Sequence, residues 1–451
     1  MDAQVLDQTL LQVRRLLEHD DVPRAIEIIE SLLPPDQADL FVELDPETQE
    51  ALLPQLEVED AADILEELSD EDAAELASRL DMDELAEIVA EMEPDKAADL
   101  LGDLSPDLLR ATLSVLDEEE AEDVRPLLLH PDETAGGLMT SEYLVFPEGM
   151  TAARALEAVK TWAPKGEQTP YIFVVGEGGR LVGVVNLFGL LRAAPTERLG
   201  ALVGAEALAA HVRDGQEEVA RLMARYDLTA VPVVDDAGRL VGVIDVDALV
   251  EVLEEEATED VQRFGGSQPL NRPYLEATIP SAASKRIGWL LLLFVTGTLT
   301  GAVMRLFQST LDHVIVLALF IPLLIGTGGN AGSQTTATVI RALAVGDIEL
   351  GDSLRVLWLE FRTALVLGLL LAAGGFVTAL LYGSSPLVAA VVAGAMLGIV
   401  IWADTVGSLL PLLAARLGLD PALVSGPMMS TVVDATGLLI YFTIAEALLV
   451  P

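Results

Sequence analysis

Long stretches without a charged side chain dominate the C-terminal part of the chain and constrain its fold more than any other feature. Residues 287–304, 314–340 and 363–403 contain no Asp, Glu, Lys or Arg. A "YGSSP" turn divides the last of these stretches, and a further apolar stretch follows Arg416. Since a helix needs about 20 apolar residues to cross a bilayer, we predict an all-α transmembrane domain of five helices over residues 285–451. Core helices of a large soluble protein are the alternative that this length of apolar sequence disfavours.

Basic residues mark the expected membrane orientation, because cytoplasmic loops are enriched in Lys and Arg. Lys285/Arg286, Arg341/Arg355 and Arg416 lie at alternate ends of the predicted spans. The N-terminus lacks the basic start and apolar centre of a signal peptide. We therefore expect a multi-pass protein of the plasma membrane (the bacterial inner membrane), with cytoplasmic N-terminal domains and the C-terminus outside.

The charge of the protein is concentrated in its first part. Residues 1–260 carry 62 Asp and Glu against 17 Lys and Arg, whereas residues 261–451 carry 10 against 9. This acidity disfavours nucleic acid as a partner, because phosphate backbones bind basic patches, and is typical of solvated or cation-binding surfaces. The chain has no cysteine, which excludes disulfides, thiolate metal sites and cysteine nucleophiles.

A 12-residue repeat organises the N-terminal part. An apolar residue recurs at this interval at Leu32, Leu44, Leu56, Leu68, Leu80, Met92, Leu104, Leu116 and Leu128. Each unit begins with acidic residues or Pro, which suit a helix N-terminus, and continues for about two helical turns. Units this short bury a face only by stacking, so we predict an all-α superhelical domain over residues 1–133. Pro94 and Pro106 oppose the alternative of one or two long amphipathic helices.

A second duplication follows. "VVGEGGRLVGVVNLFGLL" at 174–191 and "VVDDAGRLVGVIDVDALV" at 233–250 share nine of 18 positions. Each copy has the pattern of a strand, a Gly-containing turn, a second strand and a helix, and a helical stretch precedes it. This tandem β-α-β-β-α pattern resembles a pair of α/β CBS domains. We predict them at residues 134–199 and 200–253, so that the whole chain is a multidomain protein.

One carboxylate lies deep in the last apolar stretch, Asp434 in "MMSTVVDATGLLIYF". A charge at mid-membrane costs about 2.5–3.5 kcal/mol on insertion scales, so the side chain needs an ion-pair partner, a proton or a water-filled path. A polar cluster, "GTGGNAGSQTTATV", supports the path, because Asn330 and its neighbours offer uncharged oxygen ligands beside Gly328 and Gly329. Oxygen ligands suit a hard cation. The chemistry alone leaves magnesium, calcium and manganese open.

The whole chain resembles the MgtE family of magnesium channels. The motifs that carry this resemblance are "EATEDVQRFG", "PLLIGTGGNAGSQ" and "LGLDPALVSGPMMSTVVDATGLLIYF". The resemblance implies a homodimer whose pore lies on the two-fold axis and is lined by the second and fifth spans. By the same resemblance, Asp434 is the selectivity residue, Asn330 lies near the pore and Asp420 lies at its cytoplasmic mouth.

The acidic residues of the connecting segment, 254–284, are expected to regulate this pore. In the family the equivalent helix closes it. By this resemblance, magnesium ions would bridge carboxylates of the superhelical domain, the connecting helix and the CBS domains. The candidates on the connecting helix and the CBS domains are Glu256, Glu259, Asp260, Glu251, Glu217 and Asp227. Without metal these like charges repel, and with abundant cytosolic Mg2+ the compact, closed arrangement is selected.

Two departures from the family pattern leave questions open. Nucleotide-binding CBS domains carry Ser or Thr followed three residues later by Asp, but these places read Asn186–Gly189 and Asp245–Ala248 here. Tyr171 remains a candidate for stacking on a base, so binding of ATP stays open. Asp404 is a second intramembrane carboxylate, which either carries a proton or adds cation affinity.

The sequence therefore predicts a homodimeric, Mg2+-selective channel in the lipid bilayer, closed by cytosolic Mg2+. It predicts no enzyme, because there is no phosphate loop and the four histidines form no spaced cluster. The alternatives are a proton- or ion-coupled secondary transporter of divalent cations, and a metal or nucleotide sensor that the membrane part only anchors.

Overall fold

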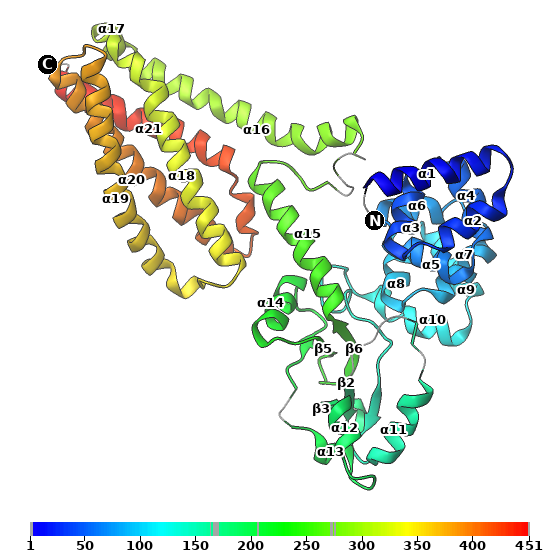
Figure 1. The fold of residues 1–451 in the computed structure, drawn as a ribbon. Helices are drawn as coiled ribbons and strands as arrows, with labels where there is room; N and C mark the ends of the chain where they lie inside the picture. The colour runs from blue at the N-terminus through cyan, green and yellow to red at the C-terminus, as the bar shows by residue number, and fades with distance from the viewer. Residues whose placement is uncertain are drawn as a thin grey trace. The chain divides into compact units, whose positions relative to one another are not determined.

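The computed structural model describes residues 3–162, 164–165, 171–204, 207–270, 274 and 277–449 (Figure 1). The chain folds into two compact units, Met1–Glu254 and Glu255–Pro451. The first unit contains the repeat domain and the two α/β copies, and the second contains the apolar helices.

Short helices build the repeat domain, and their caps explain their spacing. Asp45, Ser69, Asp81, Ser105 and Asp117 are N-caps, 12 or 24 residues apart. Oδ1 of Asp45, for example, accepts a hydrogen bond of 3.1 Å from the backbone N–H of Thr48, which satisfies a donor that the helix leaves free. The helices are α1 (Ala3–Glu18), α2 (Val22–Glu30), α3 (Pro34–Val42), α4 (Pro46–Leu52), α5 (Val58–Glu67), α6 (Asp70–Ala77), α7 (Met82–Glu91), α8 (Pro94–Asp103), α9 (Pro106–Val115) and α10 (Glu118–Val124).

The repeated apolar residues form the core of this domain. Leu44, Leu56, Leu80, Met92 and Leu104 are at most 7% exposed. Helices two apart in sequence pack together, α3 on α5 and α5 on α7 in one row, and α4 on α6 and α6 on α8 in the other. The all-α stacked-repeat prediction is confirmed.

Two three-stranded sheets follow, with the same order and register. The first copy contains β1 (Val145–Pro147), α11 (Ala152–Thr161), β2 (Tyr171–Val175), β3 (Leu181–Asn186), α12 (Leu187–Arg192) and α13 (Leu199–Leu202). The second contains β4 (Ala210–His211), α14 (Gln216–Tyr226), β5 (Ala230–Val234), β6 (Leu240–Asp245) and α15 (Val246–Phe264). In each sheet the first pair of strands is parallel and the second antiparallel. Val174 lies opposite Gly183, as Val233 lies opposite Gly242, so the duplication seen in the sequence is a structural one.

Helix α15 is longer than the predicted connecting helix. It begins at Val246, directly after β6, and runs without interruption to Phe264. The last helix of the second α/β copy and the acidic connecting helix are therefore a single helix.

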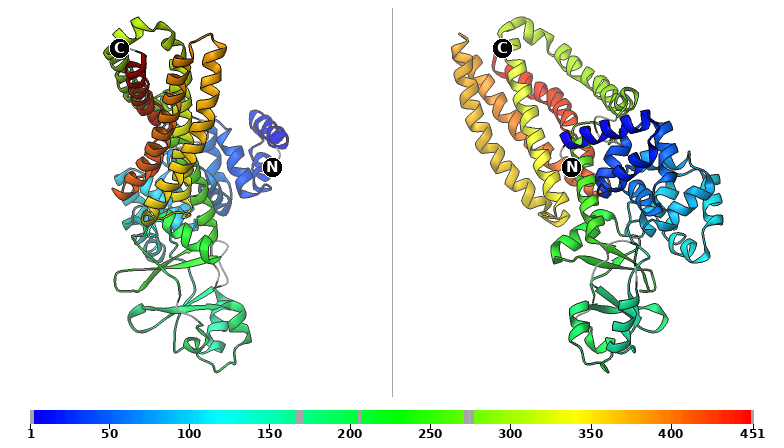
Figure 2. Two further views of the ribbon diagram at one scale, coloured as in Figure 1. Left: turned by 90° about the vertical axis from the view of Figure 1, so that its left-hand side faces the viewer. Right: turned by 45° about the vertical axis from the view of Figure 1, so that its right-hand side comes forward.

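Five helical stretches of the second unit are long and apolar enough to cross a membrane, which matches the predicted number among the residues that the structure describes. The elements are α16 (Ile279–Leu306), α17 (Gln308–His313), η4 (Ile315–Phe320), α18 (Ile321–Ala344), η5 (Leu350–Asp352), α19 (Ser353–Leu381), α20 (Pro386–Arg416), η6 (Pro421–Leu423) and α21 (Gly426–Leu449). Helices α18, α20 and α21 pack on one another, α19 packs on α20, and both views in Figure 2 show these yellow to red helices side by side. Their core includes Phe320, Ile399 and Tyr441.

The third span begins earlier than charge alone indicates. Helix α19 starts at Ser353 and so contains Glu360 and Arg362, which precede the charge-free stretch. A boundary drawn at the last charged residue therefore missed the carboxylate that this helix carries.

Candidate functional site

Glycines on α18 bring it close to its neighbours and determine which side chains face outward. A Cβ on Gly328 would lie 2.4 Å from Cγ2 of Ile399, and one on Gly329 would lie 3.1 Å from Oγ of Ser430. Both glycines are buried and pack α18 against α20 and α21, and their place in the lining of a pore remains a prediction. Asn330 is exposed instead, with its amide available to a ligand.

Asp434 lies in the middle of α21 and is half-buried. Within the part of the chain that the structure describes, its carboxylate forms no ion pair and accepts no side-chain hydrogen bond. Its neighbours Val433 and Gly437 are buried against α18 and α20, so the carboxylate is carried by a fixed helix. The ion-pair interpretation of Asp434 finds no partner among these residues.

A second polar group lies between α18, α19 and α20. Oγ1 of Thr335 lies 3.5 Å from Oε2 of Glu360, and the same hydroxyl hydrogen-bonds to the side chain of Asp404. Asp404 is 1% exposed, and within the part of the chain that the structure describes its Oδ1 has no hydrogen-bond partner. The sequence singled out Asp404 but not Glu360. The available signal was that Glu360 lies only three residues before the charge-free stretch, which begins at Thr363.

Pro411 explains why α18 and α20 meet beside this group. Proline has no N–H to donate to the carbonyl four residues earlier, so the carbonyl of Gly407 is left free within the helix. Oγ1 of Thr336 donates to that carbonyl at 3.1 Å, which is how neighbouring helices satisfy such groups in membranes. A Cβ on Gly407 would lie 2.6 Å from the carbonyl oxygen of Gly332, so only glycine permits this approach.

Arg263, near the end of α15, joins two of the predicted metal ligands. Its guanidinium forms ion pairs with Glu259 and with Asp420. Oδ1 of Asp420 also accepts a hydrogen bond of 2.7 Å from the N–H of Ala422 and caps η6. Glu256 and Asp260 lie half-buried on the same helix, and both make interactions of their own.

The predicted ligands of the first unit lie apart from one another. Glu251 accepts a hydrogen bond of 2.6 Å from Nζ of Lys96 on α8. Glu217 pairs with Arg221 at 2.6 Å on the same helix, and Asp227 is the exposed, left-handed C-cap of α14 with φ 51°. Among the described residues no group of three or more Asp, Glu or His side chains is positioned to hold a metal ion.

Carboxyl groups that the sequence did not single out crowd together around Lys96. Burial raises the pKa of Glu66 to about 7. Burial, followed by the charges of Asp95 and Glu66, raises the pKa of Glu93 to about 8. Burial also raises the pKa of Asp99 to about 7, against the opposing effect of Lys96. Such groups ionise more readily when a cation arrives.

Asp95 and Glu251 show how the repeat domain meets α15 within the first unit. Burial raises the pKa of Asp95, and its Oδ1 has no hydrogen-bond partner among the described residues. The charge of Asp247, at the start of α15, raises it further. Burial alone would lower the pKa of Lys96, but the carboxylate of Glu251 raises it overall. One lysine therefore compensates several carboxylates. The available signal in the sequence was the "PDKAAD" unit, with the only lysine of the repeat.

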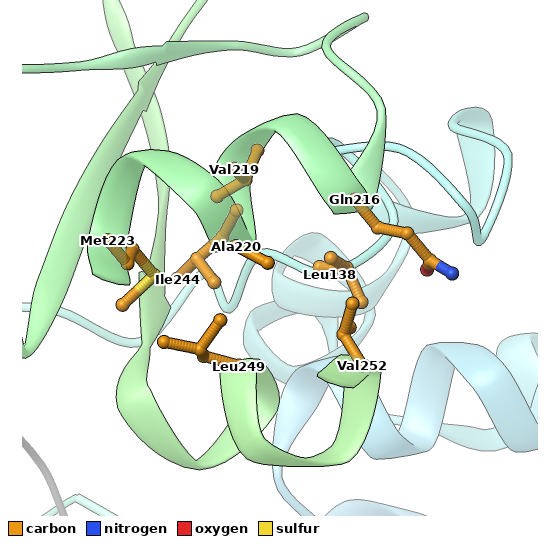
Figure 3. A pocket seen from close by; sticks show the side chains of 8 residues that line it. All are labelled: Leu138, Gln216, Val219, Ala220, Met223, Ile244, Leu249 and Val252. Atoms are coloured by element: carbon orange, nitrogen blue, oxygen red, sulfur yellow. The ribbon is translucent and has the colours of Figure 1, made fainter. Parts of the chain in front are cut away.

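The nucleotide candidate Tyr171 begins β2 and packs, half-buried, in an apolar cluster with Phe173 and Val243. Figure 3 shows the side chains that line a small gap elsewhere in the unit, between α14 and the start of α15. The gap is too small to hold a water molecule, so it is a packing defect of the core and not a ligand pocket. Its lining is Leu138, Gln216, Val219, Ala220, Met223, Ile244, Leu249 and Val252.

Three family models match the chain. Residues 321–444 match the divalent cation transporter model MgtE, and residues 32–133 match the MgtE intracellular N domain. Residues 135–196 and 207–255 match the CBS domain.

Curated proteins and solved structures are similar to the chain over long stretches. The magnesium transporter MgtE of Thermus thermophilus is 42% identical over 335 residues, 74% of each chain. The magnesium transporter MgtE of Bacillus subtilis is 33% identical over 335 residues, again 74% of each. The crystal structure of the cytosolic domain of the Mg2+ channel MgtE in complex with ATP is 36% identical with a TM-score of 0.51, and the match covers 54% of this chain and 99% of that one.

Proposed function

Because this chain belongs to the MgtE family of magnesium transporters, we propose that it is a homodimeric, Mg2+-selective channel that cytosolic Mg2+ closes. The observation that carries the proposal is Asp434, a half-buried carboxylate without an ion pair among the described residues, in the middle of an apolar helix. A side chain of this kind in a membrane span marks an ion path.

The ion path would be completed by a second copy of the chain. Asn330 is exposed on α18, which packs on α21, the helix of Asp434. Two such surfaces related by a two-fold axis would offer paired carboxylates and amides to one hydrated ion. Mg2+ keeps several of its waters and is usually bound through one or two carboxylates. An inside-negative potential drives a divalent ion inward with about 4.6 kcal/mol per 100 mV, so no other energy source is needed.

Closure would use the acidic first unit and α15. Burial, followed by the charges of neighbouring carboxylates, raises the pKa values of Glu66, Glu93 and Asp99, so these groups repel one another when they ionise. Mg2+ would relieve this repulsion and select the compact arrangement. Glu256, Glu259 and Asp260 on α15, together with Glu217, Asp227 and Glu251, remain the carboxylates that we propose to share regulatory ions. The first unit would be cytoplasmic and the C-terminus outside a bacterial inner membrane.

Mg2+ uptake by liposomes containing the purified full chain tests the proposal. We expect uptake driven by voltage alone, reduced as internal Mg2+ rises, and lost or made unselective in Asp434→Ala. Glu446→Gln is the matched control, because Glu446 is an exposed carboxylate on the same helix. Uptake that persists unchanged in Asp434→Ala would contradict the proposal, and protein that produces no flux at all would favour a membrane-anchored sensor.

A proton-coupled transporter is the second candidate, and the buried Asp404 beside Thr335 and Glu360 is the observation that favours it. Uptake measured with and without a pH gradient, at the same membrane voltage, separates the two. A channel gives equal uptake in both conditions.

A further inference from the structure

Two carboxyl groups and one hydroxyl meet where α18, α19 and α20 pack together. Oγ1 of Thr335 donates to Oε2 of Glu360 at 3.5 Å and is hydrogen-bonded to Asp404 as well. Thr335 is 7% exposed and Asp404 is 1% exposed, whereas Glu360 is half-buried. Oδ1 of Asp404 is buried and has no hydrogen-bond partner among the described residues.

Positive charge is missing from the surroundings of this group. The charged residues on the helices that pack here are Arg341, Arg355, Arg362, Arg416, Asp434 and Glu446. In the described part of the chain none of them forms an ion pair with Glu360 or Asp404, and Arg355 pairs with Asp352 instead. Among the described residues, the charge of Glu360 acts on Asp404. Two ionised carboxylates would therefore repel each other across one hydroxyl, in a domain that faces lipid.

We propose that Asp404 and Glu360 hold one proton between them across Thr335, which gives the membrane domain a proton-binding site separate from the Asp434 segment. A hydroxyl accepts one hydrogen bond while donating another. The protonated carboxyl of Asp404 donates to Oγ1 of Thr335, whose own hydrogen points to the carboxylate of Glu360. Asp404 carries the proton because it is the buried member, and Glu360 connects the site to the exterior.

The geometry suits a proton better than a metal ion. The described residues contain no group of three or more metal-ligating Asp, Glu or His side chains. Mg2+ requires six oxygen ligands in near-octahedral positions and gives up its waters reluctantly. The helices here are in close contact, since a Cβ on Gly407 would lie 2.6 Å from the carbonyl oxygen of Gly332. A proton needs neither space nor further ligands.

Labelling with dicyclohexylcarbodiimide tests the site without measuring transport, so its outcome is independent of the proposed channel function. This apolar reagent reacts only with protonated carboxyl groups, because the acid O–H adds across its C=N bond. With the full chain in lipid at neutral pH, mass spectrometry of peptides should find the adduct on Asp404 or Glu360. Asp404→Asn should lose it, and the exposed Glu446 should remain unlabelled.

Added Mg2+ and a second measurement complete the test. If Mg2+ protects the pair from labelling, the site binds metal and the proposal is overturned. A reagent that fails to reach Asp404 would also leave no adduct, so the infrared difference spectrum of the parent and Asp404→Asn decides that case. We expect this spectrum to show the loss of one protonated carboxyl C=O stretch, and its absence would overturn the proposal.

Discussion

Nζ of Lys96 lies 2.6 Å from Oε2 of Glu251, and this ion pair joins α8 to α15 across 155 residues of sequence. The ammonium group of Lys96 therefore pairs with Glu251, a carboxylate that we expected to bind metal. In the closure that we propose, Lys96 supplies part of the positive charge that brings the carboxylates of this unit together, and Mg2+ would supply the rest.

Replacing Lys96 tests whether its charge contributes to closure of the channel. In Lys96→Met we expect half-maximal shut-off of flux to need roughly five-fold more internal Mg2+, because a half-exposed ion pair contributes up to about 1 kcal/mol. Flux into liposomes at several internal Mg2+ concentrations measures the shift. Lys160→Met is the matched control, since Lys160 pairs with Glu157 on its own helix. An unchanged midpoint in Lys96→Met would contradict the role given to the pair.

The crowded carboxyl groups predict a pH dependence of stability for residues 1–254. The folded-state pKa values of Glu66 and Glu93, about 7 and about 8, lie above the ordinary 4.5. The folded unit binds these protons more tightly than the unfolded chain, so stability falls as pH rises from about 5 to about 8. If both shifts act in full, the loss over that range is on the order of 5–6 kcal/mol, and solvent screening of the partly exposed Glu93 reduces it; urea unfolding measures it.

Two comparisons identify the source of this dependence. Glu66→Gln should flatten the slope, whereas Glu47→Gln should not, because Glu47 is exposed. Millimolar Mg2+ should raise stability at pH 8 more than at pH 5. Stability that increases with pH through this range would show that these groups are not buried together in solution.

The acidic end of α15 is predicted to control closure without contributing to conduction. In the double variant Glu259→Gln/Asp260→Asn we expect flux at low internal Mg2+ to remain as in the parent, while shut-off by internal Mg2+ weakens. Glu254→Gln on the same helix serves as the control, because its side chain is exposed. Shut-off that survives intact in the double variant would rule out these carboxylates as regulatory ligands.

The close contact of α18 with α20 predicts that one methyl group added at Gly407 destabilises the protein. Gly407→Ala places a Cβ 2.6 Å from the carbonyl oxygen of Gly332, and such overpacking costs about 1–3 kcal/mol. Gly394→Ala on the same helix has no atom within 4 Å of its new Cβ and should be neutral or slightly stabilising. The difference in thermal unfolding between the two variants in detergent measures this contact.

Local patterns in the sequence predicted the elements well. The 12-residue repeat predicted short capped helices, and the 59-residue offset predicted two sheets of identical register. Charge-free stretches predicted the number of apolar spans. These features depend on residues close together in the chain, where propensity and periodicity act directly.

Pairings across the fold could not be predicted in this way. Nothing near Glu251 indicates Lys96, and nothing near Asp420 indicates that Arg263 is its partner. Glu360 was missed because a charged residue was taken as the edge of a span, although α19 continues seven residues before it. Long-range contacts depend on how the elements pack, and several packings are compatible with one local pattern.

The regular spacing of the N-caps also bears on how such a domain could change over evolutionary time. Several of the 12-residue units bring their own capping Asp or Ser and their own buried Leu or Met. An in-frame duplication or loss of such a unit would lengthen or shorten the array by one helix and leave the remaining caps intact. The length of the acidic array would therefore vary in discrete steps among related proteins.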